Sequence, residues 1–300
     1  MGLHDQNKIV LGQPFTERSY EFRLSHFCIL LTIILQNSLR LRIIKLEIKI
    51  ESVQDTKISC LLVKDDTNVR LNYFPDKKAI EFSEENILTQ IIHKNRFQFE
   101  KVMSSAVKGN IRMGQIINCV FIEGFNFLRD ADFYRIIQID RRSEKLAITT
   151  CDNESEGFHK IYADGSFFCK TGKSGYGGFI ETPDGNQEKF YQSFSDCSNN
   201  MMELMAVTEG LKRMQNIERI QVNTDSRFVI RGLTQWVHFW RHNTWQTAYG
   251  SKVKFAKHWQ QADRLCEGKL IEFRWIKGHS GHPKQSLCDQ IARESANNKQ

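Results

Sequence analysis

The sequence Ile161-Tyr-Ala-Asp-Gly-Ser166 reads as an apolar strand that ends in a carboxylate, with a glycine directly after it. Asp and Gly both favour tight reversals, so this pair on its own indicates only a turn. Three later acids, Glu203, Asp225 and Asp289, each fall at the edge of an expected helix or strand. Asp164 is therefore a candidate member of a group of four carboxylates.

The residues around this stretch alternate between strand-like and helix-like patterns. Three strands are expected first, with Asp184-Gly185 as a hairpin turn between the second and the third. A helix capped by Ser198 follows, and later strands alternate with helices. The expected strands are 159–166, 172–180, 188–194, 219–223 and 271–276, and the expected helices start near 200, 253 and 285. This order predicts an α/β fold with a mixed sheet covered by helices.

Four carboxylates brought together would repel one another unless cations held them. Hard divalent ions with oxygen ligands, Mg²⁺ or Mn²⁺, are the natural counter-charge. Two such ions roughly 3.5–4 Å apart can activate a water and stabilise a leaving oxygen in phosphodiester hydrolysis. Spacing alone does not establish such a site, because any chain of 300 residues contains scattered acids.

The N-terminal half gives weaker signals. Residues 1–39 are a poorly defined segment, and 40–150 read as a small α+β or β-rich domain of unknown function. The acidic stretch 151–157 is expected to be a linker before a domain at 158–297. An apolar block at 27–35 suits a buried strand or helix; as a membrane anchor it is about half the roughly 20 residues required.

Charge and cysteine usage narrow the class of protein. The net charge of +7 is uneven: residues 159–300 hold 20 Lys and Arg against 14 Asp and Glu, whereas 1–158 hold 22 against 21. A basic half with a few clustered acids suits a polyanion bound over a metal site, although a solvated basic surface would look similar. The eight cysteines form no CxxC pair, which argues against structural zinc and favours reduced thiols.

Six motifs in residues 158–297 resemble, in order and in spacing, those of the ribonuclease H type 1 family. They are Tyr162-Ala-Asp-Gly-Ser166, Asn199-Asn-Met-Met-Glu-Leu-Met-Ala206, Thr224-Asp-Ser226, Gly232-Leu-Thr-Gln-Trp236, Lys277-Gly-His-Ser-Gly-His-Pro283 and Cys288-Asp-Gln-Ile-Ala292. The resemblance implies a five-stranded mixed sheet flanked by helices. It also implies an endoribonuclease that cuts the RNA strand of RNA–DNA hybrids, leaving 5′-phosphate and 3′-hydroxyl ends.

The resemblance also implies roles for individual residues. The four acids would hold two Mg²⁺ or Mn²⁺ ions, and His279, in a glycine-flanked loop, would assist proton transfer and product departure. Only RNA carries a 2′-hydroxyl, so side chains and backbone facing the minor groove would distinguish the two strands. The implied substrate contacts are Gly165, Ser166, Cys169, Ser198, Asn199, Asn200 and Thr247, with Phe228 and Trp236 lining the DNA-strand channel.

A basic protrusion is expected from Arg241, Lys252, Lys254 and Lys257, adding salt-dependent affinity for phosphates. Three features depart from the family pattern. The segment 241–246 is less basic than usual, Phe255 stands where a phosphate-binding Asn is expected, and Gln285-Ser286 replaces the usual Asn-Glu pair. These departures predict weaker hybrid affinity and a looser start to the last helix, but they leave all four acids in place.

The sequence therefore predicts an active, monomeric ribonuclease H that binds hybrid duplexes and needs no obligate protein partner and no membrane. The alternatives are a catalytically weak hybrid-binding protein and a domain derived from a reverse-transcribing element. The absence of an Arg-rich presequence or a spanning segment predicts an intracellular protein of the nucleus or cytoplasm, with the mitochondrion left open.

Overall fold

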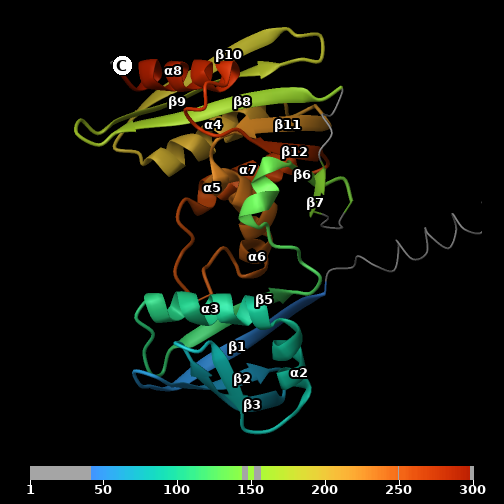
Figure 1. Cartoon of the computed structure of the whole chain (residues 1–300), viewed down its shortest axis with the longest axis vertical. Helices are drawn as coiled ribbons and strands as arrows, with labels where there is room; N and C mark the ends of the chain where they lie inside the picture. Colours follow the sequence, from blue (N-terminus) through green and yellow to red (C-terminus); the bar gives the residue numbers. More distant parts are fainter. Residues whose placement is uncertain (1–41, 144–147, 152–156, 249, 298–300) are drawn as a thin grey trace, which may run out of the picture. The chain divides into compact units, whose positions relative to one another are not determined.

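A computed structural model of the chain describes residues 42–143, 148–151, 157–248 and 250–297. The expectations for the segment 1–39 and its apolar block lie outside these residues. Two sheets are present, with strand orders β4-β3-β2-β1-β5 and β10-β9-β8-β11-β12-β6-β7 (Figure 1). The prediction of a mixed sheet flanked by helices, preceded by a β-rich region, is confirmed.

The first sheet is antiparallel and alternates buried with more exposed residues, as expected when one face is covered. Helix α3 contributes buried Phe99 and Met103 to its core. Asn86 caps α2 by accepting hydrogen bonds from the backbone N–H groups of Leu88 and Thr89. The elements are β1 (Ile43–Val53), β2 (Ile58–Lys64), β3 (Thr67–Phe74), β4 (Ala79–Phe82), α2 (Ile87–Lys94), α3 (Arg96–Lys108) and β5 (Ile116–Ile122).

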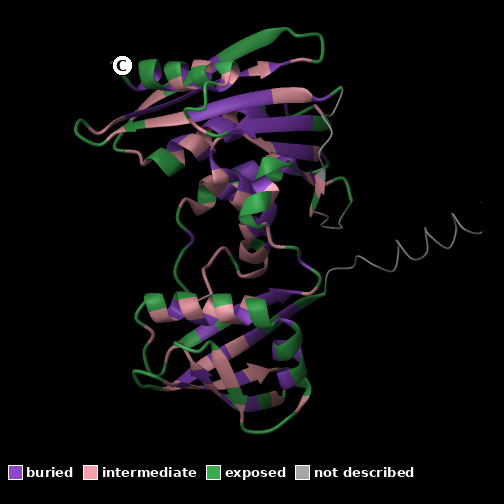
Figure 2. Cartoon of the chain, viewed as in Figure 1, coloured by how far each residue is buried: buried purple, intermediate pink, exposed green. Residues whose placement is uncertain are grey.

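The second sheet contains the expected five strands, in the order β10-β9-β8-β11-β12. Strands β8, β9 and β10 pair antiparallel, whereas β11 runs parallel to both β8 and β12. Figure 2 shows that β8, β9, β11 and β12 are largely buried, whereas β10 is mostly exposed. The strands are β8 (His159–Phe168), β9 (Lys173–Glu181), β10 (Gln187–Ser195), β11 (Arg219–Thr224) and β12 (Leu270–Trp275).

Two further strands extend this sheet beyond the five expected from the sequence. Strand β6 (Ile136–Asp140) pairs antiparallel with β12, and β7 (Ile148–Cys151) pairs with β6. Isoleucines at 137 and 139 are buried in the same core as Phe273 of β12, which accounts for the pairing. The division into domains near 151–157 remains a prediction, but these strands of the expected N-terminal domain belong to the second sheet.

Helices cover both faces of the second sheet. Gly165 and Gly177 illustrate this: a Cβ on Gly165 would lie 2.4 Å from the backbone N of Glu203 in α4, and one on Gly177 would lie 2.5 Å from the backbone N of Ala292 in α8. The remaining elements are η1 (Asp130–Tyr134), α4 (Asn199–Arg213), α5 (Arg227–Arg231), η2 (Gly232–Trp236), α6 (Val237–His242), α7 (Ala256–Cys266) and α8 (Pro283–Asn297). None of the helices in the described ranges is long and apolar enough to cross a membrane.

Candidate active site

Strand β8 places Asp164 and Gly165 on opposite faces of the sheet, because successive side chains of a strand alternate. Asp164 is 7% exposed and lies opposite Gly177, on the face covered by α8. Its Oδ1 accepts a hydrogen bond from the backbone N of Gly165 at 2.7 Å. Gly165 faces α4, where no side chain would fit, so this glycine allows the backbone of Glu203 to approach the strand.

Glu203 is held by two donors before any substrate arrives. The Nδ2 of Asn199 donates to its Oε1 at 2.6 Å, and the hydroxyl of Ser226 donates to its Oε2. Ser226 also accepts a hydrogen bond from the backbone N of Val229 and so caps α5. One serine therefore orients the carboxylate on α4 and fixes the chain just after Asp225.

Asp225 follows the last residue of β11 and is enclosed by the chain that leaves β12. A Cβ on Gly278 would lie 2.6 Å from the Oδ2 of Asp225. The indole Nε1 of Trp275 donates to the backbone carbonyl of Asp225 at 2.8 Å. The end of β12 thus fixes Asp225 from two sides.

Asp289 lies on the second turn of α8 and is half-buried. Its Oδ1 accepts a hydrogen bond from the Nε of Arg293, one helical turn later, at 2.8 Å. This ion pair is partly exposed, so it would yield readily to a stronger ligand.

The electrostatics of the group show that the four carboxylates lie close enough to interact. Burial, and then the charges of Asp225, Asp289 and Glu203, raise the pKa of Asp164 to about 8. Burial and the charge of Asp225 raise the pKa of Glu203 to about 7, against the hydrogen bond from Ser226. The pKa of Asp225 is raised, mainly by burial, and nearby His279 opposes this. The site therefore has an excess of negative charge that a cation would relieve.

The donor set suits a hard divalent cation. All four side chains offer carboxylate oxygens, which Mg²⁺ and Mn²⁺ prefer. Among the residues that the structure describes, no three His, Cys, Asp or Glu side chains already converge as a formed metal cluster. Glu203 and Asp289 point instead to protein donors, so binding a cation would require these two carboxylates to exchange partners.

His279 lies beside the acids in the loop between β12 and α8. It is exposed, has a left-handed φ of 53°, and interacts electrostatically with Asp225. His282 accepts a hydrogen bond from the backbone N of Gln285 through its Nδ1 (3.4 Å), which is a structural contact at the start of α8. Gln285 is 4% exposed, and neither atom of its side-chain amide has a partner among the described residues.

The expected substrate contacts at the start of α4 form a continuous edge beside Glu203. Asn199 and Asn200 are exposed, and the Oγ of Ser198 is buried without a partner in the part of the chain described. Ser166 is half-buried on β8, and Cys169 is an exposed, free thiol just after this strand. That these residues contact the substrate remains a prediction from the sequence.

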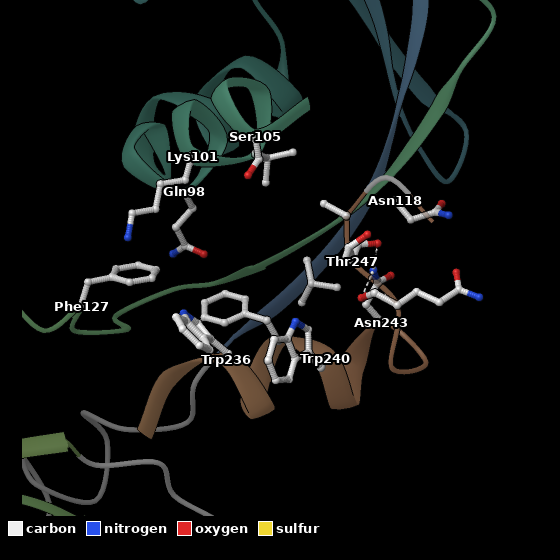
Figure 3. A pocket seen from close by; sticks show the side chains of 14 residues that line it. Gln98, Lys101, Ser105, Asn118, Phe127, Trp236, Trp240, Asn243 and Thr247 are labelled. Carbon is white, nitrogen blue, oxygen red and sulfur yellow. Dashed lines mark hydrogen bonds between the residues drawn. The ribbon is translucent and has the colours of Figure 1, made fainter. Parts of the chain in front are cut away.

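The aromatic residues expected in the DNA-strand channel lie together. The rings of Phe228 and Trp236 are 5.6 Å apart, and both pack against buried Trp259. Trp236, Trp240 and Thr247 also line a cavity of about 400 Å³, to which α3 contributes Lys101 and Gln98 (Figure 3). Trp240 is half-buried at the edge of this cavity.

The four basic residues expected in the protrusion differ in their surroundings. Lys252, Lys254 and Lys257 are exposed, as a phosphate-binding surface requires. Arg241 instead pairs with buried Asp263 (3.2 Å). Asp263 also pairs with Arg141 at 2.8 Å, so a phosphate contact by Arg241 would compete with a buried ion pair.

Three residues that support the site were not singled out from the sequence: Ser226, Trp275 and Arg293. Ser226 stands at a recognisable helix N-cap position, and Arg293 follows Asp289 at helical spacing, so both carried a local signal. Trp275 carried no such signal, because nothing in the sequence indicates which backbone carbonyl its indole reaches.

Comparisons with known proteins agree with this architecture. A family model described as RNase H matches residues 157–297. The ribonuclease H of Actinobacillus pleuropneumoniae serotype 5b (strain L20) is 36% identical over 139 residues, which is 46% of this chain and 90% of that protein. The ribonuclease H of Idiomarina loihiensis is 37% identical over 136 residues, covering 45% of this chain and 86% of that protein.

One similar solved structure is that of LC9-RNase H1, described as a type 1 RNase H with the type 2 active-site motif. It is 27% identical, covers 48% of this chain and 74% of that chain, and has a TM-score of 0.42. The two bacterial ribonucleases H are each more than 30% identical to this chain, and the chain covers most of the length of both. The chain therefore belongs to the RNase H family. The predicted resemblance and the predicted class of enzyme, a ribonuclease H, are confirmed.

Proposed function

We propose that this protein hydrolyses the RNA strand of RNA–DNA hybrids with two divalent cations, Mg²⁺ or Mn²⁺, leaving 5′-phosphate and 3′-hydroxyl ends. The observation that carries the proposal is the charge coupling among Asp164, Glu203, Asp225 and Asp289 at one edge of the sheet. These four residues would hold the cations. When bound, the cations would supply an activated water and stabilise the leaving oxygen.

Residues around the four acids would position them, transfer protons and bind the RNA strand. Ser226 orients Glu203 until a cation displaces this hydrogen bond, and Trp275 fixes the backbone position of Asp225. His279, exposed and adjacent to Asp225, would accept or donate a proton as product leaves. Asn199 donates its Nδ2 to Glu203, which leaves its amide oxygen to accept a hydrogen bond from a 2′-hydroxyl of RNA.

The other substrate contacts are proposed from exposure and position. Asn200, Ser198 and Ser166 would contact the RNA strand, and Phe228 with Trp236 would pack against deoxyribose of the DNA strand. Lys252, Lys254 and Lys257 would add salt-dependent phosphate contacts. We propose that the protein acts as a monomer, because this arrangement draws every catalytic group from one chain.

The direct test is to incubate a labelled RNA–DNA hybrid with Mg²⁺ and wild-type protein, Asp225→Asn or Asp184→Asn. Asp184 lies exposed in the turn after β9 and is the matched control. Cleavage by wild type and Asp184→Asn, with loss of at least about a thousand-fold in Asp225→Asn, is expected. Binding without cleavage by wild type would favour the hybrid-binding alternative, and equal cleavage by all three would refute the assigned site.

A further inference from the structure

A second cavity, of about 310 Å³, opens at the end of β12, next to the end of β11, which Asp225 follows. Its walls come from the end of η1, the start of β6 and the end of β12, which lie side by side (Figure 1). We call it the Tyr134 pocket; its lining residues are Phe133, Tyr134, Arg135, Ile136, Arg274, Trp275 and Lys277. Four of these residues precede the segment 157–297 that matches the RNase H family.

The pocket combines an exposed aromatic ring with positive charge. Tyr134 is 73% exposed and meets Trp275 edge-on, with ring centroids 5.4 Å apart. Lys277 is exposed at its rim. Arg135 and Arg274 also line the pocket and add positive charge to it, although each already interacts with another group. The exposed ring of Tyr134 and the charge of Lys277 therefore lie at the same pocket.

Arginine and aromatic side chains pack against one another behind the pocket. The guanidinium of Arg227 stacks on Trp275, 4.1 Å from the ring centroid, and that of Arg231 lies over Phe133. Asp130 on η1 pairs with Arg231 at 2.7 Å, so this acid is occupied. One acid thus faces two arginines, so the charge behind the pocket stays positive, like that of Lys277.

The pocket adjoins the reaction centre directly. Trp275, which forms its floor, donates to the backbone carbonyl of Asp225 at 2.8 Å. Lys277 immediately precedes Gly278, which is in close contact with the carboxylate of Asp225. A strand whose phosphate reaches Asp225 would thus have its neighbouring nucleotides within reach of Tyr134.

We propose that the Tyr134 pocket binds an unpaired nucleotide of the RNA strand where this strand leaves the hybrid duplex. The base would stack on Tyr134, and the adjoining phosphate would contact Lys277. An unpaired base is required because a paired base is already stacked within the duplex, whereas single-stranded bases stack freely on exposed aromatic rings. This inference rests on the proposed function and specifies a preferred substrate: a hybrid with a single-stranded RNA extension.

The test compares kcat/KM for a blunt hybrid with that for the same hybrid carrying a single-stranded extension on either end of the RNA strand. Tyr134→Ala should lower the ratio of extended to blunt by about five-fold or more, the loss expected for one stacked base. Tyr134→Phe keeps the ring and should keep the ratio. Tyr191→Ala, which removes a tyrosine 63% exposed on β10, is the matched control.

The outcomes separate this inference from the proposed function. Cleavage of both hybrids by wild type, with the same ratio in Tyr134→Ala, would overturn the inference and leave the proposed function intact. The inference would also be overturned if Tyr134→Ala lowered kcat/KM only for a hybrid with a single-stranded extension of the DNA strand, and not for one with an extension of the RNA strand. No cleavage of the blunt hybrid by wild type would instead refute the proposed function.

Discussion

The indole of Trp275 donates a hydrogen bond to the backbone carbonyl of Asp225, with 2.8 Å between Nε1 and O. The bond joins the ends of two neighbouring parallel strands at the point where Asp225, a proposed metal ligand, follows β11. The position of Asp225 thus depends on a residue fifty positions later, on the floor of the Tyr134 pocket.

Trp275→Phe removes this hydrogen bond while keeping an aromatic ring. We expect kcat to fall about five- to ten-fold, because losing a bond worth roughly 1 kcal/mol frees the backbone that positions Asp225. Steady-state kinetics on a blunt hybrid measures the effect. Trp245→Phe, in the cluster next to Trp240, is the control and should leave kcat unchanged. A change in KM alone for Trp275→Phe would contradict the expectation.

Gly278→Ala places a methyl group against the carboxylate of Asp225, because a Cβ at this position would lie 2.6 Å from its Oδ2. Since the carboxylate must move, we expect kcat to fall by about a hundred-fold, as small displacements of catalytic groups can cause. Circular dichroism and the melting temperature should change little. The control is Gly109→Ala at the end of α3, where the nearest atoms would be 3.4 Å away. Activity within two-fold of wild type would show that Asp225 tolerates the displacement.

Asp164→Asn tests the electrostatic strain of the site. The folded pKa of about 8 exceeds the roughly 3.9 of an unfolded Asp, so the folded chain holds the extra proton. The contribution of Asp164 to the free energy of unfolding of the wild type therefore decreases as the pH rises from about 4 to 8. In EDTA, the melting temperature of Asp164→Asn minus that of wild type should therefore increase as the pH rises through this window. Each kcal/mol of difference in the free energy of unfolding should shift the melting temperature by about 2–4 °C.

Mg²⁺ should raise the melting temperature of wild type at pH 8 and have less effect on Asp164→Asn, because a ligand is lost. Asp184→Asn, in an exposed turn, serves as the control for the loss of a carboxylate. A difference in melting temperature between Asp164→Asn and wild type that does not vary with pH would show that the carboxylate is not strained.

Phe255→Asn addresses the departure at the start of α7. Phe255 has a left-handed φ of 62°, a conformation that Asn adopts more readily than Phe. Relief of about 1 kcal/mol of strain should offset the lost packing of its half-buried ring, so the melting temperature should change little. If the Asn contacts phosphate, KM for a hybrid should fall and its salt dependence should steepen. Phe255→Leu, which adds no donor, should not lower KM.

Much of the catalytic region could be predicted from the sequence because its signals are local. The hairpin turn at Asp184 and the start of α4 after Ser198 depend on neighbouring residues alone. Two local expectations were wrong: β8 continues through Asp164 to Phe168, and the hydroxyl of Ser198 makes no capping hydrogen bond among the described residues. The hairpin of β6 and β7 could not be assigned to its sheet in this way. Its strands alternate like any half-buried strand, and only the packing of Ile137 and Ile139 with Phe273 shows which sheet they extend.

From the sequence alone, the four carboxylates at Asp164, Glu203, Asp225 and Asp289 could be predicted as one group, because the motifs that contain them resemble those of the ribonuclease H type 1 family in order and spacing. Their surroundings depended on the tertiary structure. Only the folded chain shows that α4 packs closely against Gly165 and that the indole of Trp275 donates to the backbone carbonyl of Asp225. It also shows that Arg241 pairs with Asp263. Each of these contacts joins residues far apart in the sequence, and side-chain direction and burial, which decide such contacts, follow from packing and not from local pattern.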